Sequence, residues 1–152
     1  MSNAARPSGL TAMAILNFVL GAFMLMQVPA MALLLAMHEG ALPGSRSEQN
    51  KVAVELVEKA GKPLIATAMG LYGLTGIVQI LAGLGYLKMR RFLGRGLGNL
   101  YVILAIALSL TWGVGTAAAR GGGFNLGLIL NLVYPLITVV LINTTFREDL
   151  VN

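Results

Sequence analysis

Apolar residues fall into four long runs separated by short polar segments. The runs cover about residues 10–37, 64–87, 97–119 and 124–142. A helix of about 20 residues crosses the roughly 30 Å hydrocarbon core of a bilayer. The pattern therefore predicts an all-α fold, an integral membrane four-helix bundle that forms one domain over residues 1–152.

The first run is longer than a straight span requires. It contains Pro29, which removes a backbone donor inside a helix, so we expect this span to tilt or bend. A cleaved signal peptide is the rival interpretation, because Arg6 precedes the run and residues 30–32 (Ala-Met-Ala) have the small-x-small cleavage pattern. The run far exceeds the ~7 to 15 apolar residues of a signal peptide, which favours a span.

Residues 38–62 form the main polar segment, between the first two spans. Its second part, 45–61, is predicted to be a short extracytoplasmic amphipathic helix with an apolar stripe of Ala53, Leu56, Val57 and Ala60. Helix spacing also predicts two ion pairs, Glu55–Lys59 and Glu58–Lys62. The helix either lies on the bilayer or across the mouth of the bundle, or it docks a partner. Apolar stripes are common on helices that only cover an interface, which favours the first alternative.

Composition agrees with a membrane protein. The chain is 57% hydrophobic and 11% charged, and its mean hydropathy is +0.79. The net charge of +5 comes from basic residues in the loops, where membrane orientation and anionic headgroups account for them, so nucleic acid is not an expected partner. The absence of cysteine excludes disulfides, thiolate nucleophiles and cysteine-ligated clusters.

Basic residues concentrate in a glycine-rich turn, 83–99, between the second and third spans. The four are Lys88, Arg90, Arg91 and Arg95. Basic residues in short loops face the cytoplasm, so both termini are expected to be cytoplasmic. Six of the eleven Lys and Arg residues then lie inside. We interpret the turn as a topological anchor that also recruits anionic lipid, with Tyr86 and Tyr101 as aromatic anchors at the headgroup level.

Small and polar side chains recur along one face of each span, where helices associate in lipid. The third span carries a small-residue seam of Ala105, Ser109, Gly113 and Ala117. The second span carries Tyr72, Thr75, Gly76, Gln79 and Gly83. The first carries Ala14, Asn17, Gly21 and Met24, and the fourth carries Gly127, Asn131, Pro135 and Thr138.

Depth in the bilayer predicts which amides pair. Asn17 and Gln79 lie about 10 Å and about 12 Å from the cytoplasmic end of their spans. Gln27 and Asn131 both lie nearer the outer face. We predict an Asn17–Gln79 and a Gln27–Asn131 contact as interhelical polar contacts, each contributing about 1 kcal/mol or less. As an alternative, the same amides line a polar pathway.

The sequence offers little catalytic chemistry. The four spans contain no Asp, Glu, Lys, Arg or His, which proton relays and coupled transporters normally require. Residues 94–99 depart from the dinucleotide-binding GxGxxG pattern because Asn99 replaces its last glycine. His38 has too few ligands nearby for a metal site, and Ser109 has no base on its span. We therefore expect neither an enzyme nor a bound cofactor or metal.

Both ends of the chain resemble a known group of proteins. Residues 6–12 (RPSGLTA) with 15–17 (ILN), and 134–137 (YPLI) with 141–144 (LINT), look like small four-span bacterial membrane proteins described as a domain of unknown function. The resemblance implies a bacterial cytoplasmic membrane and implies no activity.

Two functions remain open on these grounds. The small-residue seams favour a non-enzymatic membrane protein that acts by helix association, as an accessory subunit of a larger membrane complex or as a homo-oligomer. The alternative is a transporter or channel for a small neutral or lipid-like molecule, with the Gln and Asn side chains as its polar contacts.

Overall fold

The regular elements are all helices over the residues that the computed structural model describes, 7–41, 51–119 and 126–150. For 52–53, 114, 116, 118–119 and 126–131 the description covers the backbone only. The predicted all-α fold class is confirmed. In chain order the elements are α1 (Ser8–His38), α2 (Lys51–Ala60), α3 (Lys62–Leu87), a π-helical turn η2 (Phe92–Gly96), α4 (Leu97–Ala119) and α5 (Leu126–Asn143).

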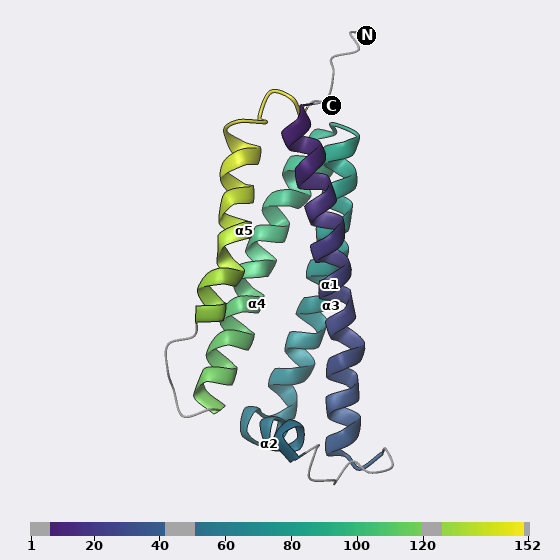
Figure 1. Ribbon diagram of the computed structural model, residues 1–152, viewed down its shortest axis with the longest axis vertical. Helices are drawn as coiled ribbons and strands as arrows, with labels where there is room; N and C mark the ends of the chain where they lie inside the picture. The colour runs from purple at the N-terminus through teal and green to yellow at the C-terminus, as the bar shows by residue number, and fades with distance from the viewer. Residues whose placement is uncertain (1–6, 42–50, 120–125, 151–152) are drawn as a thin grey trace.

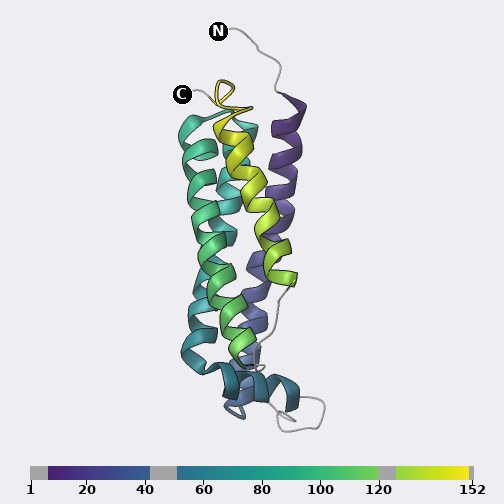
Figure 2. The same cartoon turned by 90° about the vertical axis from the view of Figure 1, so that its left-hand side faces the viewer.

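The four long helices run side by side along the longest axis of the molecule (Figures 1 and 2). Helix α3 contacts both α1 and α4, and α4 contacts α5. The start of α1 and the end of α5 lie at the same end, where Phe146 packs against Gly9 and joins Leu10 in a buried cluster. The basic turn between α3 and α4 lies at this end too (Figure 1).

Among the described residues, three helices are long enough and apolar enough to cross a membrane, which indicates a membrane protein. They are Ser8–His38, Lys62–Leu87 and Phe92–Gly113, with mean hydropathies of 2.1, 1.7 and 1.6 in their most apolar windows. These spans correspond to the first three predicted apolar runs. Within the part of the chain that was described, Leu132–Asn143 is a shorter apolar helix.

Helix α2 lies across the end of the bundle opposite the basic turn (Figure 1). Its Val57 is buried in a cluster with Met31 of α1 and with Ile65 and Ala68 of α3. Trp112 of α4 packs against the same cluster. Val57, one residue of the predicted apolar stripe of α2, therefore packs within the chain.

One of the two ion pairs predicted for α2 forms and the other does not. Lys59 Nζ lies 2.6 Å from Glu55 Oε1. The predicted Glu58–Lys62 pair is wrong, because Lys62 Nζ contacts Glu39 Oε1 instead, at 3.0 Å. The reason is Gly61, whose φ of +85° breaks the helix between these residues and removes the one-turn spacing that the prediction assumed.

The glycine-rich segment 83–99 is mostly helical, and the connection between the second and third spans is shorter than the predicted 88–96, because residues 91–96 are helical as well. Helix α3 continues to Leu87, and the next helical residues begin immediately after Arg90. Met89 has a φ of +51°, as in the left-handed region that lets a chain reverse in few residues. A Cβ on Gly85 would clash with the backbone of Leu93 and Gly94, so glycine at this position lets η2 lie directly against α3.

The predicted aromatic anchors face the interior. Tyr86 is 0% exposed and Tyr101 is 2% exposed, so neither side chain is accessible to lipid headgroups in this structure. Both rings fill the space between helices that meet through small residues, as Gly98 beside the Tyr86 hydroxyl illustrates. Phe92, which is 75% exposed at the basic turn, is the aromatic side chain that projects outward here.

Candidate functional site

Helices α1 and α3 approach closely along the two faces that the sequence analysis singled out for packing. A Cβ on Gly76 would lie 2.9 Å from the carbonyl oxygen of Gly21, and a Cβ on Gly21 would lie 3.0 Å from that of Gly76. About two helical turns further along α3, a Cβ on Gly83 would lie 3.2 Å from the Ala14 carbonyl oxygen. Glycine therefore sets the separation of the two helices.

Asn17 occupies the centre of a buried polar cluster between helices. Gln79 Nε2 of α3 donates to Asn17 Oδ1 at 3.5 Å, and the Tyr134 hydroxyl of α5 donates to the same oxygen at 2.7 Å. The ring of Tyr134 also lies against Tyr101 of α4, with centroids 6.2 Å apart. The structure thus brings together Asn17 and Gln79, and it adds Tyr134, which joins α5 to α1.

Several polar atoms of this region are buried and form no hydrogen bond with any residue that the structure describes. They are Asn17 Nδ2, Gln79 Oε1, the hydroxyl oxygens of Thr75 and Thr138, and the Tyr86 hydroxyl. All five side chains are 0% exposed. Since none carries a formal charge, the cluster can orient helices through hydrogen bonds but offers no acid or base with an ordinary pKa near neutrality.

The second predicted amide pair is not tested. Gln27 of α1 is half-buried. The side chain of Asn131 lies outside the described residues, so the contribution of a Gln27–Asn131 contact stays a prediction.

The small-residue seam of α4 faces the inside of the bundle. Ala105, Ser109 and Gly113 are buried, and Ala117 is half-buried. Ala105 lies in a cluster with Val78 of α3, and α5 side chains pack against the same cluster. Along its described length the seam is therefore occupied by helices of the same chain.

The basic side chains of the turn differ in exposure and in hydrogen bonding. Lys88, Arg90 and Arg91 are exposed, and none forms an ion pair with another described residue. Arg95 is half-buried, and its Nε donates to Asn143 Oδ1 of α5 at 2.9 Å. One arginine of the turn is thus fixed in orientation while the others are solvated.

Asn143 organises the polar contacts beside Arg95. Its Nδ2 donates to Asn99 Oδ1 at 2.8 Å and to the Val139 carbonyl oxygen at 2.8 Å. The reciprocal bond from Asn99 Nδ2 to Asn143 Oδ1 is longer, at 3.5 Å. These contacts join α4 and α5 at the end of the bundle where the chain begins.

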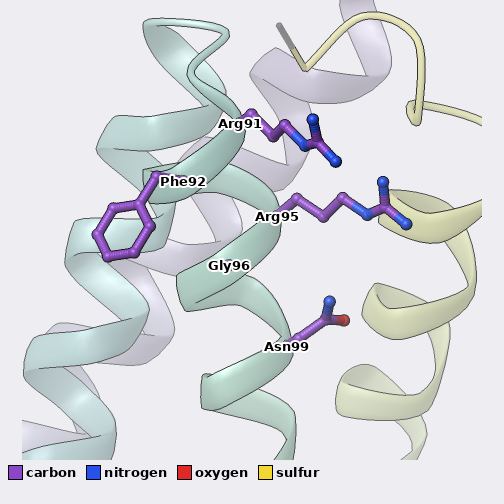
Figure 3. Close-up of a pocket in the computed structure, with 5 residues that line it drawn as sticks. All are labelled: Arg91, Phe92, Arg95, Gly96 and Asn99. Atoms are coloured by element: carbon purple, nitrogen blue, oxygen red, sulfur yellow. The ribbon is translucent and has the colours of Figure 1, made fainter. Parts of the chain in front are cut away.

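An open groove of about 450 Å³ lies over this turn, lined by Arg91, Phe92, Arg95, Gly96 and Asn99. Figure 3 shows the three polar side chains projecting toward α5 from one side of the helix, with Phe92 on the other side. The groove therefore joins a cationic face to an apolar one.

Sequence reasoning missed Tyr134, Asn99 and Asn143 as contact residues. Asn143 directly follows the fourth apolar run and Asn99 is the third residue of the third run, so the depth argument that pairs Asn17 with Gln79 also brings these two to one level. Tyr134 gave no such signal, because a tyrosine within a span can either donate a hydrogen bond to another helix or simply pack its ring in the core.

Within the described residues no three His, Asp or Glu side chains lie close enough to hold a metal ion. No protein-family model, curated protein or solved structure matches the chain.

Proposed function

We propose that this chain is a four-span, non-enzymatic protein of the bacterial cytoplasmic membrane that acts by helix association. Helix α5 has 18 residues, a length of about 27 Å, which nearly matches the hydrocarbon core. It runs beside the three longer helices over the same region of the molecule (Figure 2). These features support α5 as the fourth span, with both termini on one side.

The main support for the proposal is the large apolar surface of α1 that no other helix of the chain covers among the described residues. Only 11% of the residues in its most apolar window are buried, against 33% and 39% for the two other long spans. Ile15, Val19, Phe23 and Met26 are each more than half exposed along its outer side. A helix held mainly by one neighbour leaves a long face for another helix, either of an accessory partner or of a second copy.

The buried amides favour association over transport. Asn17 and Gln79 have no exposed surface, and Asn17 Oδ1 accepts hydrogen bonds from Gln79 of α3 and from Tyr134 of α5. A pathway for a neutral molecule needs polar side chains that line an accessible space. In this conformation the two amides instead hold helices together.

Cysteine cross-linking tests the proposal directly, because the chain has no cysteine of its own. Val19→Cys on α1 and Val140→Cys on α5 replace apolar side chains that are 61% and 57% exposed. Oxidation in native membranes should link Val19→Cys into a species of defined mass and leave Val140→Cys unlinked. A disulfide-linked dimer identifies a homo-oligomer. A partner that carries no thiol at the contact is captured instead by a maleimide-linked photo-reactive group attached to the same cysteine, which gives a heavier species of fixed composition.

The same result would be checked by native mass analysis in mild detergent. A monomer without partner, together with equal cross-linking at the two positions, contradicts association through α1.

Topology is tested in the same cysteine-free background. We propose that the basic turn and both termini face the cytoplasm and that α2 is extracytoplasmic, because short loops rich in Lys and Arg stay inside. An impermeant maleimide added to intact cells should label Glu58→Cys on α2 and spare Thr145→Cys, both of which replace exposed residues. The reverse labelling pattern contradicts this orientation.

A further inference from the structure

The groove over the basic turn has the features of a site for one anionic group. Arg91 is exposed, and Arg95 is held beside it by its bond to Asn143. Among the described residues no carboxylate forms an ion pair with either arginine. Because Nε is the atom that bonds Asn143, the two terminal nitrogens of Arg95 keep their donors, and guanidinium groups match phosphate oxygens in geometry.

The apolar side of the groove indicates whether the anionic group belongs to a lipid or to a soluble compound. Phe92 is 75% exposed, and Gly96 beside it is exposed without a side chain. On the same side of α4, Leu100 and Ile103 are 41% and 64% exposed, which continues the apolar surface into the span. A soluble phosphate would leave this apolar strip exposed. An acyl chain attached to the phosphate would bury it, which is favourable.

We propose that the groove binds the phosphate of an anionic membrane phospholipid between Arg91 and Arg95, with one acyl chain along Gly96, Leu100 and Ile103. Asn99 lines the same groove, and its amide is oriented by Asn143. Lys88 and Arg90 lie on the same turn but do not line the groove, so they add only general attraction for the anionic surface. The proposal does not depend on association through α1.

This distinction provides matched variants. R91Q/R95Q and K88Q/R90Q remove the same number of charges from the same turn. Two charge-assisted contacts between arginine and phosphate correspond to about a 30-fold change in affinity. We expect R91Q/R95Q to weaken binding by about this factor and K88Q/R90Q by less than about three-fold.

The experiment uses the full chain, delipidated in dodecyl maltoside micelles and titrated with phosphatidylglycerol while native mass spectrometry counts bound lipid. Phosphatidylcholine serves as the zwitterionic comparison and should bind more weakly. Inorganic phosphate and glycerophosphoglycerol, the headgroup without chains, serve as soluble competitors. Neither should displace the lipid at matched concentration.

Two results would overturn the proposal. Equal loss in the two double variants would mean that only the total charge of the turn attracts lipid. Displacement by a soluble competitor at matched concentration would assign the groove to a soluble phosphate compound rather than to a lipid.

The bond from Arg95 to Asn143 also links α4 to α5, so R91Q/R95Q can affect folding. Helical circular dichroism and Trp112 fluorescence detect such a change. The single variants R91Q and R90Q replace exposed side chains and avoid it. R91Q removes a charge-assisted contact to the phosphate and should weaken binding about five-fold, R90Q should weaken it less than about two-fold, and equal effects contradict the site.

Discussion

A methyl group added at Gly76 tests the contact between α1 and α3. Its Cβ would lie 2.9 Å from the backbone carbonyl oxygen of Gly21 and 2.9 Å from Cγ of Leu25. The leucine side chain can move, but the carbonyl moves only if α1 shifts as a whole. Gly76→Ala is therefore expected to separate two helices that also share the Asn17–Gln79 contact.

The magnitude follows from two opposing effects. Overpacking a close contact costs about 1–3 kcal/mol, while alanine in place of glycine returns about 0.5–1 kcal/mol of helix propensity. Gly70→Ala in the same helix is the matched control, because a Cβ there meets no atom within 4 Å. Propensity is common to both variants, so Gly76→Ala should be less stable than Gly70→Ala by about 1–3 kcal/mol.

Unfolding in dodecyl maltoside micelles by added sodium dodecyl sulfate measures this difference. Helical circular dichroism follows the whole molecule, and the single tryptophan, Trp112, reports on the α2 end through its contact with the cluster around Val57. If Gly76→Ala and Gly70→Ala change the unfolding free energy equally, the close approach of the two helices is refuted.

Three further predictions concern single contacts. Asn17→Leu and Tyr134→Phe both remove the 2.7 Å hydrogen bond, so a double-mutant cycle in the same unfolding assay should show a coupling of about 1 kcal/mol, and strict additivity would contradict that bond. Tyr86→Phe should leave stability unchanged or increase it, because the buried hydroxyl forms no hydrogen bond of good geometry with a described residue, and a loss beyond about 1 kcal/mol would show that such a bond exists. Lys59 holds the pKa of Glu55 below its usual range, first by a hydrogen bond and second by its charge. The pair therefore stabilises the folded chain above the pKa of unfolded Glu55 and ceases to do so as pH falls through the folded pKa. Lys59→Met should raise the Glu55 pKa, measured by carbon NMR of the carboxyl group, and an unchanged pKa rules out this coupling.

Much of the architecture follows from hydropathy. Long uncharged runs must form helices in lipid, where every backbone polar group needs a partner, so the spans were predictable without knowledge of any contact. The faces of the first two spans were predictable as well. Glycine, alanine and amide residues at helical spacing mark where backbones approach, and Gly21 lies against Gly76 as those faces require.

The partners of individual side chains were less predictable. A pair spaced one turn apart forms only if the helix is continuous, and Gly61 breaks it, so Lys62 contacts Glu39 across the chain. Tyr86 flanks a basic loop in the sequence, but its ring is buried between helices. Neither outcome can be read from spacing alone, because each depends on the direction in which the next helix leaves.

Residue type and spacing are sufficient to predict that the chain forms apolar helices and that a short basic turn joins the second and third spans. They also predict the faces of the first two spans that come into close contact. Those features depend on residue type and helical period, which are local. Three features are visible only in the folded chain. Tyr134 hydrogen-bonds Asn17, the seam from Ala105 to Ala117 faces the neighbouring helices, and Arg95 hydrogen-bonds Asn143. These contacts join residues far apart in the chain, and their existence depends on how four helices rotate and cross, which no local pattern encodes.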